Sequence, residues 1–189
     1  MNALENWYCS TSFWRWMTRE RLLPWLLGRA DLGDQVLEIG AGAGAATAEL
    51  RKRASHVISL EYDHLFAAKL AQKNGAGAGV VQGDAASLPF ADRTFSSAIA
   101  VLVLHHLRSR ELQDRAFAEI HRVLQAGGRF FAFEIPDGWL NRVIHTNSTF
   151  VPVQPDVLAA RLTTAGFVDI VLDRRPGGFS VRAARKANS

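Results

Sequence analysis

Short apolar runs alternate with longer stretches of helical character along most of the chain, and this alternation predicts strands separated by helices. The apolar runs carry few charges, which is typical of parallel strands buried on both faces of a sheet. They lie at residues 36–39, 56–61, 80–82, 97–104, 129–135, 168–173 and 179–184. The helical stretches are 44–54, 64–72, 111–124 and 156–165. The pattern predicts an α/β fold built on a mostly parallel sheet.

The last two predicted strands are connected differently from the others. Residues 174–178 between them are too few for a crossover helix, so we expect the final strand to run antiparallel to its neighbour. The segment 136–155 shows no regular period. We expect it to be irregular and to carry contacts to a substrate.

The first 30 residues differ from the rest in composition, because they hold four of the five tryptophans. Aromatic and aliphatic positions are interrupted by charged ones, which predicts one or two amphipathic helices. Three roles are compatible with this arm. It can pack its aromatic face over the sheet, close a substrate pocket as a lid, or contact a membrane surface without spanning it.

The most informative stretch is VLEIGAGAG at residues 36–44, in which a strand ends in three alternating glycines. Gly40, Gly42 and Gly44 lack a Cβ, so the backbone can take positive φ there and a ligand can lie against it. A glycine turn between a strand and a helix is a nucleotide-binding corner, and by itself it also fits a dinucleotide. Glu38 favours another ligand, because a carboxylate beside the turn would repel phosphates and attract the positive groups of S-adenosylmethionine.

The sequence E-x-G-x-G-x-G resembles motif I of the class I S-adenosylmethionine-dependent methyltransferases, in particular their small, single-domain, UbiE-like (type 11) members. Two further segments resemble the same family, LHHL at residues 104–107 and RVLQAGGRFFAFE at residues 122–134. Ser96 departs from the family pattern, which usually has an aspartate directly after the phenylalanine. The resemblance covers about residues 34–185 and leaves the arm outside it.

This resemblance implies a Rossmann-like fold with helices on both faces of a seven-stranded sheet. The implied strand order is 3-2-1-4-5-7-6, with the last strand antiparallel. We therefore expect an aromatic helical arm or lid at residues 1–30 and a cofactor-binding domain at residues 31–189.

Several acidic and small residues are expected to hold the cofactor. Glu61 lies 21 residues beyond Gly40, at the end of the second predicted strand, where an acid can accept hydrogen bonds from both ribose hydroxyls. Asp84 resembles the acid that accepts the adenine amino group in this family. The complete predicted set is Glu38, Gly40, Gly42, Gly44, Glu61, Tyr62, Asp84, Ala85, Ala100 and Val101.

Candidates for catalysis are less well defined. If the acceptor is an oxygen or carbon acid that needs a base, then His105, Glu134 and His145 are the candidates. Adjacent histidines such as His105 and His106 also suggest a metal, but the sequence has no third histidine or carboxylate at ligand spacing, so no metal is expected. The single cysteine, Cys9, has no partner for a disulfide or a metal knuckle.

Composition narrows the partners further. The net charge is +4 and the basic residues are scattered, so no nucleic acid partner is expected. No run approaches the ~20 apolar residues that cross a bilayer, and the N-terminus lacks the pattern of a signal peptide. We expect a cytoplasmic monomer or homodimer that acts on a small-molecule acceptor.

The sequence thus predicts an S-adenosylmethionine-dependent methyltransferase that acts by in-line displacement on a small, fairly apolar acceptor. Two alternatives stay open. A binding module of the same fold could hold the cofactor without turnover, since motif I reports binding and not chemistry. An NAD(P)-dependent oxidoreductase is disfavoured by Glu38, Asp84 and the antiparallel last strand.

Overall fold

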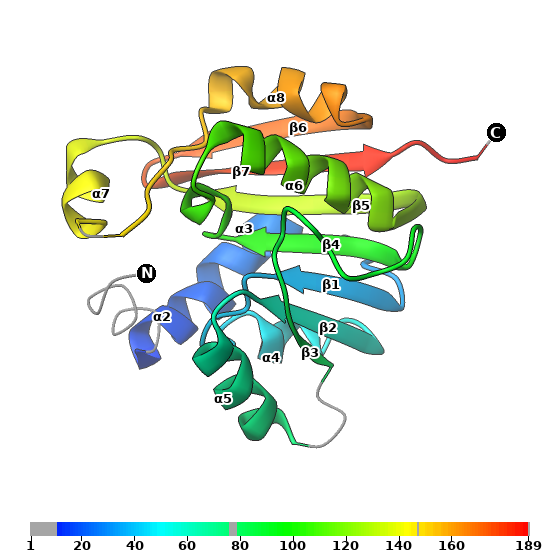
Figure 1. Cartoon of the computed structure of the whole chain (residues 1–189), viewed down its shortest axis with the longest axis horizontal. Helices are drawn as coiled ribbons and strands as arrows, with labels where there is room; N and C mark the ends of the chain where they lie inside the picture. Colours follow the sequence, from blue (N-terminus) through cyan, green and yellow to red (C-terminus); the bar gives the residue numbers. More distant parts are fainter. Residues whose placement is uncertain (1–10, 76–78, 147, 189) are drawn as a thin grey trace.

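Seven strands form one sheet in the computed structural model, which describes residues 11–75, 79–146 and 148–188. Their order is β3-β2-β1-β4-β5-β7-β6. All neighbouring pairs are parallel except those made by β7, and Figure 1 shows β7 running against β4. The predicted fold class is confirmed. The strands are β1 (Gln35–Ile39), β2 (His56–Glu61), β3 (Val80–Gln82), β4 (Phe95–Val101), β5 (Leu124–Glu134), β6 (Phe167–Arg175) and β7 (Gly178–Arg185).

The helices follow most of the predicted ranges. They are α2 (Ser12–Met17), the π-helical η1 (Thr18–Leu22), α3 (Leu23–Leu27), α4 (Thr47–Leu50), α5 (His64–Asn74), the 3-10 helix η2 (Leu104–His106), α6 (Arg110–Val123), α7 (Trp139–Ile144) and α8 (Pro155–Thr164). Asp63 caps the start of α5, because its Oδ1 accepts hydrogen bonds from the amides of Leu65 and Phe66.

Several predicted boundaries were wrong. The strand predicted at 97–104 ends at Val101, and Leu104 begins the 3-10 helix η2. The helix after the glycine turn is a single turn, α4, because the turn itself extends over residues 42–46. The fifth strand begins at Leu124 and not at 129, and a register shift in its pairing with β4 accommodates the extra residues. The segment 136–155 contains a short helix, α7, although no sequence period marks it.

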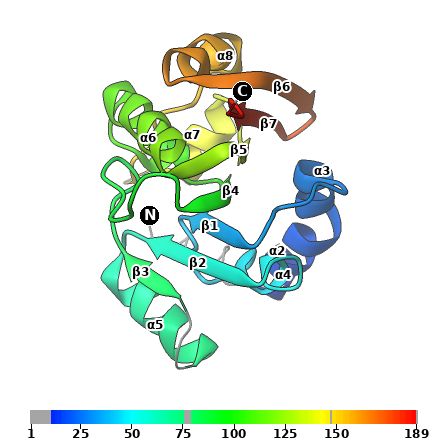
Figure 2. The same cartoon turned by 90° about the vertical axis from the view of Figure 1, so that its right-hand side faces the viewer.

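Side chains alternate between the two faces of the central strands and build two separate cores. Leu37, Ala98 and Phe130 belong to the core beneath α6 and α8, whereas Val36, Ile99 and Phe131 belong to the core beneath the N-terminal helices and α4. Figure 2 shows α6 on one side of the strands and α2, α3 and α4 on the other. The hydrophobic face of the arm, together with α4, therefore covers this side of the central strands.

Specific polar contacts fasten the arm to the end of the chain. The indole Nε1 of Trp25 donates to Asp173 Oδ2 at 2.5 Å, and the Arg182 guanidinium donates to the carbonyls of Trp25 and Leu26. The guanidinium of Arg175 lies 4.6 Å from the centre of the Trp25 ring. Cys9 and the rest of the arm before residue 11 lie outside the described residues. Among the residues that the structure describes, no helix is both long and apolar enough to span a bilayer.

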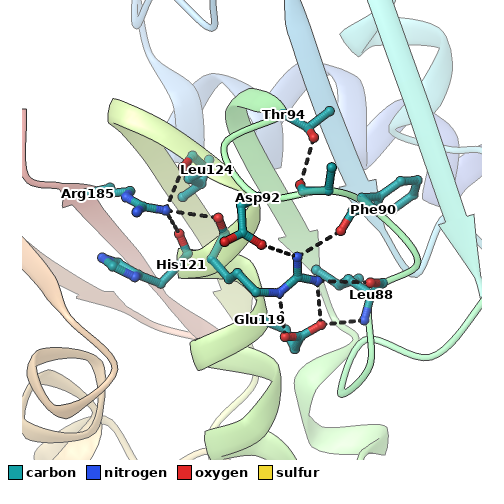
Figure 3. Close-up of polar contacts among 10 residues, drawn as sticks. Leu88, Phe90, Asp92, Thr94, Glu119, His121, Leu124 and Arg185 are labelled. Atoms are coloured by element: carbon teal, nitrogen blue, oxygen red, sulfur yellow. Dashed lines mark hydrogen bonds and ion pairs between the residues drawn. The ribbon is translucent and has the colours of Figure 1, made fainter.

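A cluster around Arg122 fixes the loop between β3 and β4 (Figure 3). Its guanidinium donates to the backbone carbonyls of Leu88 and Phe90 and to the carboxylates of Glu119 and Asp92. Glu119 in turn accepts a hydrogen bond from the amide of Leu88. These contacts hold the loop against the C-terminal part of α6. The loop carries the predicted adenine-binding residues Asp84 and Ala85.

Candidate active site

A cavity of about 1390 Å³ opens at the carboxyl ends of β1, β2 and β4. Its walls come from the glycine turn after β1, the end of β2, helix η2 and helix α7, and the N-terminal helices line it as well. In Figure 1 the arrowheads of β1 and β4 point toward this end of the sheet, where α7 lies. Pockets for one small ligand measure ~300–1,000 Å³, so this cavity has room for a cofactor and a second molecule.

The glycine turn fits a ligand that lies directly against the backbone. Gly40 has φ of +70°, and a Cβ there would lie 2.3 Å from Cγ2 of Val103. Gly42 has φ of +51°, and a Cβ there would meet nothing within 4 Å. Both glycines line the cavity. Gly40 is therefore required for close packing of the turn, whereas Gly42 exposes its backbone to the cavity.

Glu61 is the acid at the end of β2, and both of its carboxylate oxygens are engaged by backbone amides. Its Oε2 accepts a hydrogen bond from the amide of Gly42 at 2.7 Å, and its Oε1 accepts one from the amide of Asp63 at 2.9 Å. Glu61 and its neighbour Tyr62 line the cavity. The side chain of Glu61 thus links the glycine turn to the end of β2.

Glu38 is buried in the cavity wall, only 3% exposed. Its Oε2 accepts hydrogen bonds from the hydroxyls of Thr47, at 2.6 Å, and Ser59, at 2.7 Å. Burial raises the pKa of Glu38 to about 7, although these hydrogen bonds and Arg51 act in the opposite direction. A cation bound beside Glu38 would favour the charged carboxylate.

This raised pKa makes stability depend on pH. The carboxyl of Glu38 loses its proton at lower pH in the unfolded chain than in the folded one. The contribution of Glu38 to the free energy of unfolding is therefore fully present below pH ~4.5 and is lost as the pH rises through about 7. We expect the Glu38→Gln variant to be roughly 2–3 kcal/mol more stable than the parent at pH 8.5, since each pKa unit corresponds to ~1.4 kcal/mol. At pH 5 this difference should be small.

Urea unfolding at pH 5, 7 and 8.5 measures this effect. Glu49→Gln on α4 is the matched control, because the Glu49 carboxylate pairs with Lys52 at the surface. Its difference from the parent should stay nearly constant over the same pH range. A constant difference for Glu38→Gln as well would contradict the assignment.

Only some of the remaining predicted cofactor residues line the cavity. Ala85 and Val101 line the cavity, whereas Gly44, Asp84 and Ala100 do not. Ala100 faces the core beneath α6, as strand alternation requires. A Cβ at Gly44 would lie 2.6 Å from Cδ1 of Leu70, so this glycine permits close packing of α5. Asp84 Oδ1 accepts a hydrogen bond from the Ala86 amide and shapes the loop after β3.

The three catalytic candidates meet at the far end of the cavity. His105 and His145 line it, and Glu134 lies behind His105. Glu134 Oε2 is 2.5 Å from Nδ1 of His105, while its Oε1 accepts hydrogen bonds from the amides of Val103 and Leu104. Glu134 is 1% exposed and contacts His105 rather than the cavity.

Sequence reasoning missed several residues that line the cavity from other elements. Trp14, Met17 and Trp25 reach it from the arm, and Ile99 reaches it from β4. The aromatic composition of the arm was the available signal, and it allowed both packing and lid roles. The described helices of the arm share one core with the sheet and also line the cavity. The lid role stays a prediction.

Comparison with known proteins places this fold and site in a family. The family model described as a methyltransferase domain matches residues 37–132, just over half of the chain. The chain therefore belongs to the methyltransferase domain family, within the class I S-adenosylmethionine-dependent methyltransferases.

Among curated relatives, a demethylmenaquinone methyltransferase of Thermobifida fusca is 37% identical over 54% of this chain and 44% of the relative. A demethylmenaquinone methyltransferase of Mycolicibacterium vanbaalenii is 28% identical over 93% of this chain and 84% of the relative. The match to the Thermobifida protein thus spans less than half of that relative's length.

Solved structures support the same fold. A Pyrococcus horikoshii protein superposes with a TM-score of 0.80 at 16% identity, covering 95% of this chain and 94% of that one. The cyclase SpnF superposes with a TM-score of 0.66 at 21% identity, covering 89% of this chain and 82% of that one. At these identities the likeness shows the fold alone. Proteins with different activities share this fold, as the cyclase shows.

Proposed function

We propose that this chain transfers the methyl group of S-adenosylmethionine to a small, largely apolar acceptor. The observation that carries the proposal is the pair of carboxylates, Glu38 and Glu61, on either side of the open glycine turn. Two acids in one cavity wall favour a ligand with ammonium and sulfonium groups and disfavour the phosphates of a dinucleotide. This is the charge pattern that a methyl-donating cofactor needs.

The other cofactor contacts follow from this arrangement. Gly40 and Gly42 would hold the amino acid end of the cofactor near Glu38, and Glu61 with Tyr62 would hold the ribose. Ala85 and its neighbour Asp84 would contact the adenine, with Val101 beneath it. When bound, S-adenosylmethionine supplies a methyl group activated by a positively charged sulfur.

The acceptor would lie between the aromatic residues of the arm and the histidines. Trp14, Trp25 and Phe133 line the cavity, so an apolar or aromatic acceptor would displace water from these surfaces. The two curated relatives described above are named for demethylmenaquinone, and a quinol of this kind is therefore the first acceptor to test.

The chain's contribution to the reaction would be mainly positioning. The bond from sulfur to methyl breaks as the bond from methyl to the acceptor forms, and charge on the sulfur disappears. A dry cavity favours this loss of charge, and alignment of the acceptor, methyl and sulfur supplies much of the rate. His105, held by Glu134, is the polar group placed to contact the acceptor.

Isothermal titration with S-adenosylhomocysteine and with NAD and NADP tests the cofactor. We expect micromolar binding of S-adenosylhomocysteine and no binding of either dinucleotide. Binding of a dinucleotide instead would favour an oxidoreductase and contradict the proposal.

Turnover is tested separately with S-adenosylmethionine labelled in its methyl group and a panel of hydroquinones and phenols. Transfer of label to an organic product is the expected result. Binding of the cofactor without transfer to any acceptor in the panel would favour a non-catalytic module.

A further inference from the structure

Most of the large apolar side chains that are exposed among the described residues lie on three segments that also line the cavity. In Figure 1 two of these segments, α2 and α7, lie at the end of the sheet toward which the arrowheads of β1 and β4 point. The cavity opens at this same end. We call the exposed set the apolar rim, and its members are Phe13 and Trp16 on α2, Tyr62 and Leu65 between β2 and the first turn of α5, and Trp139 and Val143 on α7.

Helix α2 presents aromatic residues on two of its faces. Trp14 and Met17, three residues apart, lie on the face that lines the cavity. Phe13 and Trp16, also three residues apart, lie on a neighbouring face and do not line it. The two exposed rings are 6.0 Å apart between their centres, so they form one continuous apolar surface. An amphipathic helix that packs on a sheet needs only one apolar face, and the second one therefore calls for another contact.

The other two segments expose apolar residues beside the cavity in the same way. On α7, Asn141 lies on the face that lines the cavity. Trp139 and Val143, four residues apart, lie on another face, and Trp139 is 77% exposed. At the end of β2, Tyr62 both lines the cavity and is largely exposed. The apolar rim thus borders the mouth of the cavity from three segments that are far apart in the sequence.

Positive charge accompanies the apolar rim on the arm. Residues 12–22 hold three exposed arginines, Arg15, Arg19 and Arg21, against one acid, Glu20. Aromatic side chains with arginines between them are typical of helices that lie in the headgroup region of a bilayer, where the rings enter the acyl boundary and the cations meet anionic lipids. A lipid surface also suits a rim around an opening, because fluid lipid adapts to separate apolar side chains, whereas a folded partner protein needs one continuous patch.

We propose that the apolar rim docks on a bilayer surface that contains anionic lipids, with the mouth of the cavity facing the lipid. The contact is peripheral and uses side chains of α2, α7 and the start of α5. In one respect this inference rests on the proposed function and deepens it. An apolar acceptor partitions into lipid, and a cavity that opens on the bilayer receives it without a passage through water.

Flotation of the full chain with lipid vesicles measures this contact without turnover. We expect binding to vesicles of phosphatidylglycerol and phosphatidylcholine, and weaker binding to phosphatidylcholine alone or at high salt. Trp139→Ser should lower the affinity about tenfold and Arg19→Gln about fivefold. Val143→Ser should lower it about threefold or more. Val171→Ser is the matched control and should bind as the parent does, because Val171 on β6 is 58% exposed, Val143 is 59% exposed, and only Val143 belongs to the rim.

Three results would overturn the proposal. They are no binding of the parent to vesicles with anionic lipid, equal weakening in Val143→Ser and Val171→Ser, and self-association of the parent that Trp139→Ser abolishes in place of vesicle binding. Titration of the same samples with S-adenosylhomocysteine, without vesicles, separates this proposal from the proposed function. Retained cofactor binding without vesicle binding would refute the lipid contact alone, whereas vesicle binding without cofactor binding would refute the proposed function.

Discussion

Replacing Glu61 with alanine should weaken binding of S-adenosylhomocysteine by about 100- to 1,000-fold. The variant loses the acceptor proposed for the ribose hydroxyls, and it also loses the 2.7 Å hydrogen bond that holds the amide of Gly42. Hydrogen bonds to a charged group contribute ~1.5–3 kcal/mol each, and each ~1.4 kcal/mol corresponds to a tenfold change in affinity. Isothermal titration at fixed pH and salt measures the loss.

Two further variants make this result specific. Glu61→Gln keeps one carbonyl oxygen and should bind with intermediate affinity. Glu49→Ala removes an acid from the nearby helix α4 outside the cavity and should bind as the parent does. Circular dichroism and thermal unfolding establish that each variant is folded. Unchanged affinity in folded Glu61→Ala would show that the cofactor does not use this acid.

Changing Glu134 to glutamine should reverse the tautomer of His105. The amide oxygen of glutamine can accept the hydrogen bonds from Val103 and Leu104 that Oε1 now accepts. Its NH₂ group then faces Nδ1 of His105, and because it donates, Nδ1 must lose its proton to Nε2. Two-bond ¹H–¹⁵N correlation spectra of the protein measure this directly.

The same change should have only a small effect on stability. With Nε2 protonated, His105 presents a donor rather than an acceptor to the cavity, while the free energy of unfolding should fall by only about 1 kcal/mol. Glu134→Ala leaves three donors near the buried site without an acceptor, so we expect it to lose about 3 kcal/mol or more. An unchanged His105 tautomer in Glu134→Gln would contradict the positioning role.

Local sequence was sufficient for the sheet and for the end of the cavity at the glycine turn. The apolar runs specified the strands, and the short connection at 176–177 required β7 to be antiparallel. The sequence itself marks the ends of the strands, and the predicted site residues were identified from their places beside those ends. These residues are Glu38, Gly40, Gly42 and Glu61. In a parallel sheet those ends meet at one edge, so neighbours in space follow from neighbours in the pattern.

The rest of the cavity could not be predicted in the same way. His145 directly follows α7, a helix without a hydrophobic period, and Trp14 and Trp25 come from an arm whose packing the sequence left undecided. The sequence placed Ala100 at the cavity wall, but the structure places Ile99 there. Neighbouring residues of a strand face opposite sides of the sheet, and only the register of β4 shows which of the two faces the cavity.

The sequence alone thus determined the class of fold, the glycine turn and the acids beside it, because local spacing and strand topology are sufficient for these. Only the tertiary structure decided that three histidines and Glu134 form one cluster. Their contacts join η2, β5 and α7, elements whose mutual placement depends on the packing of the whole core.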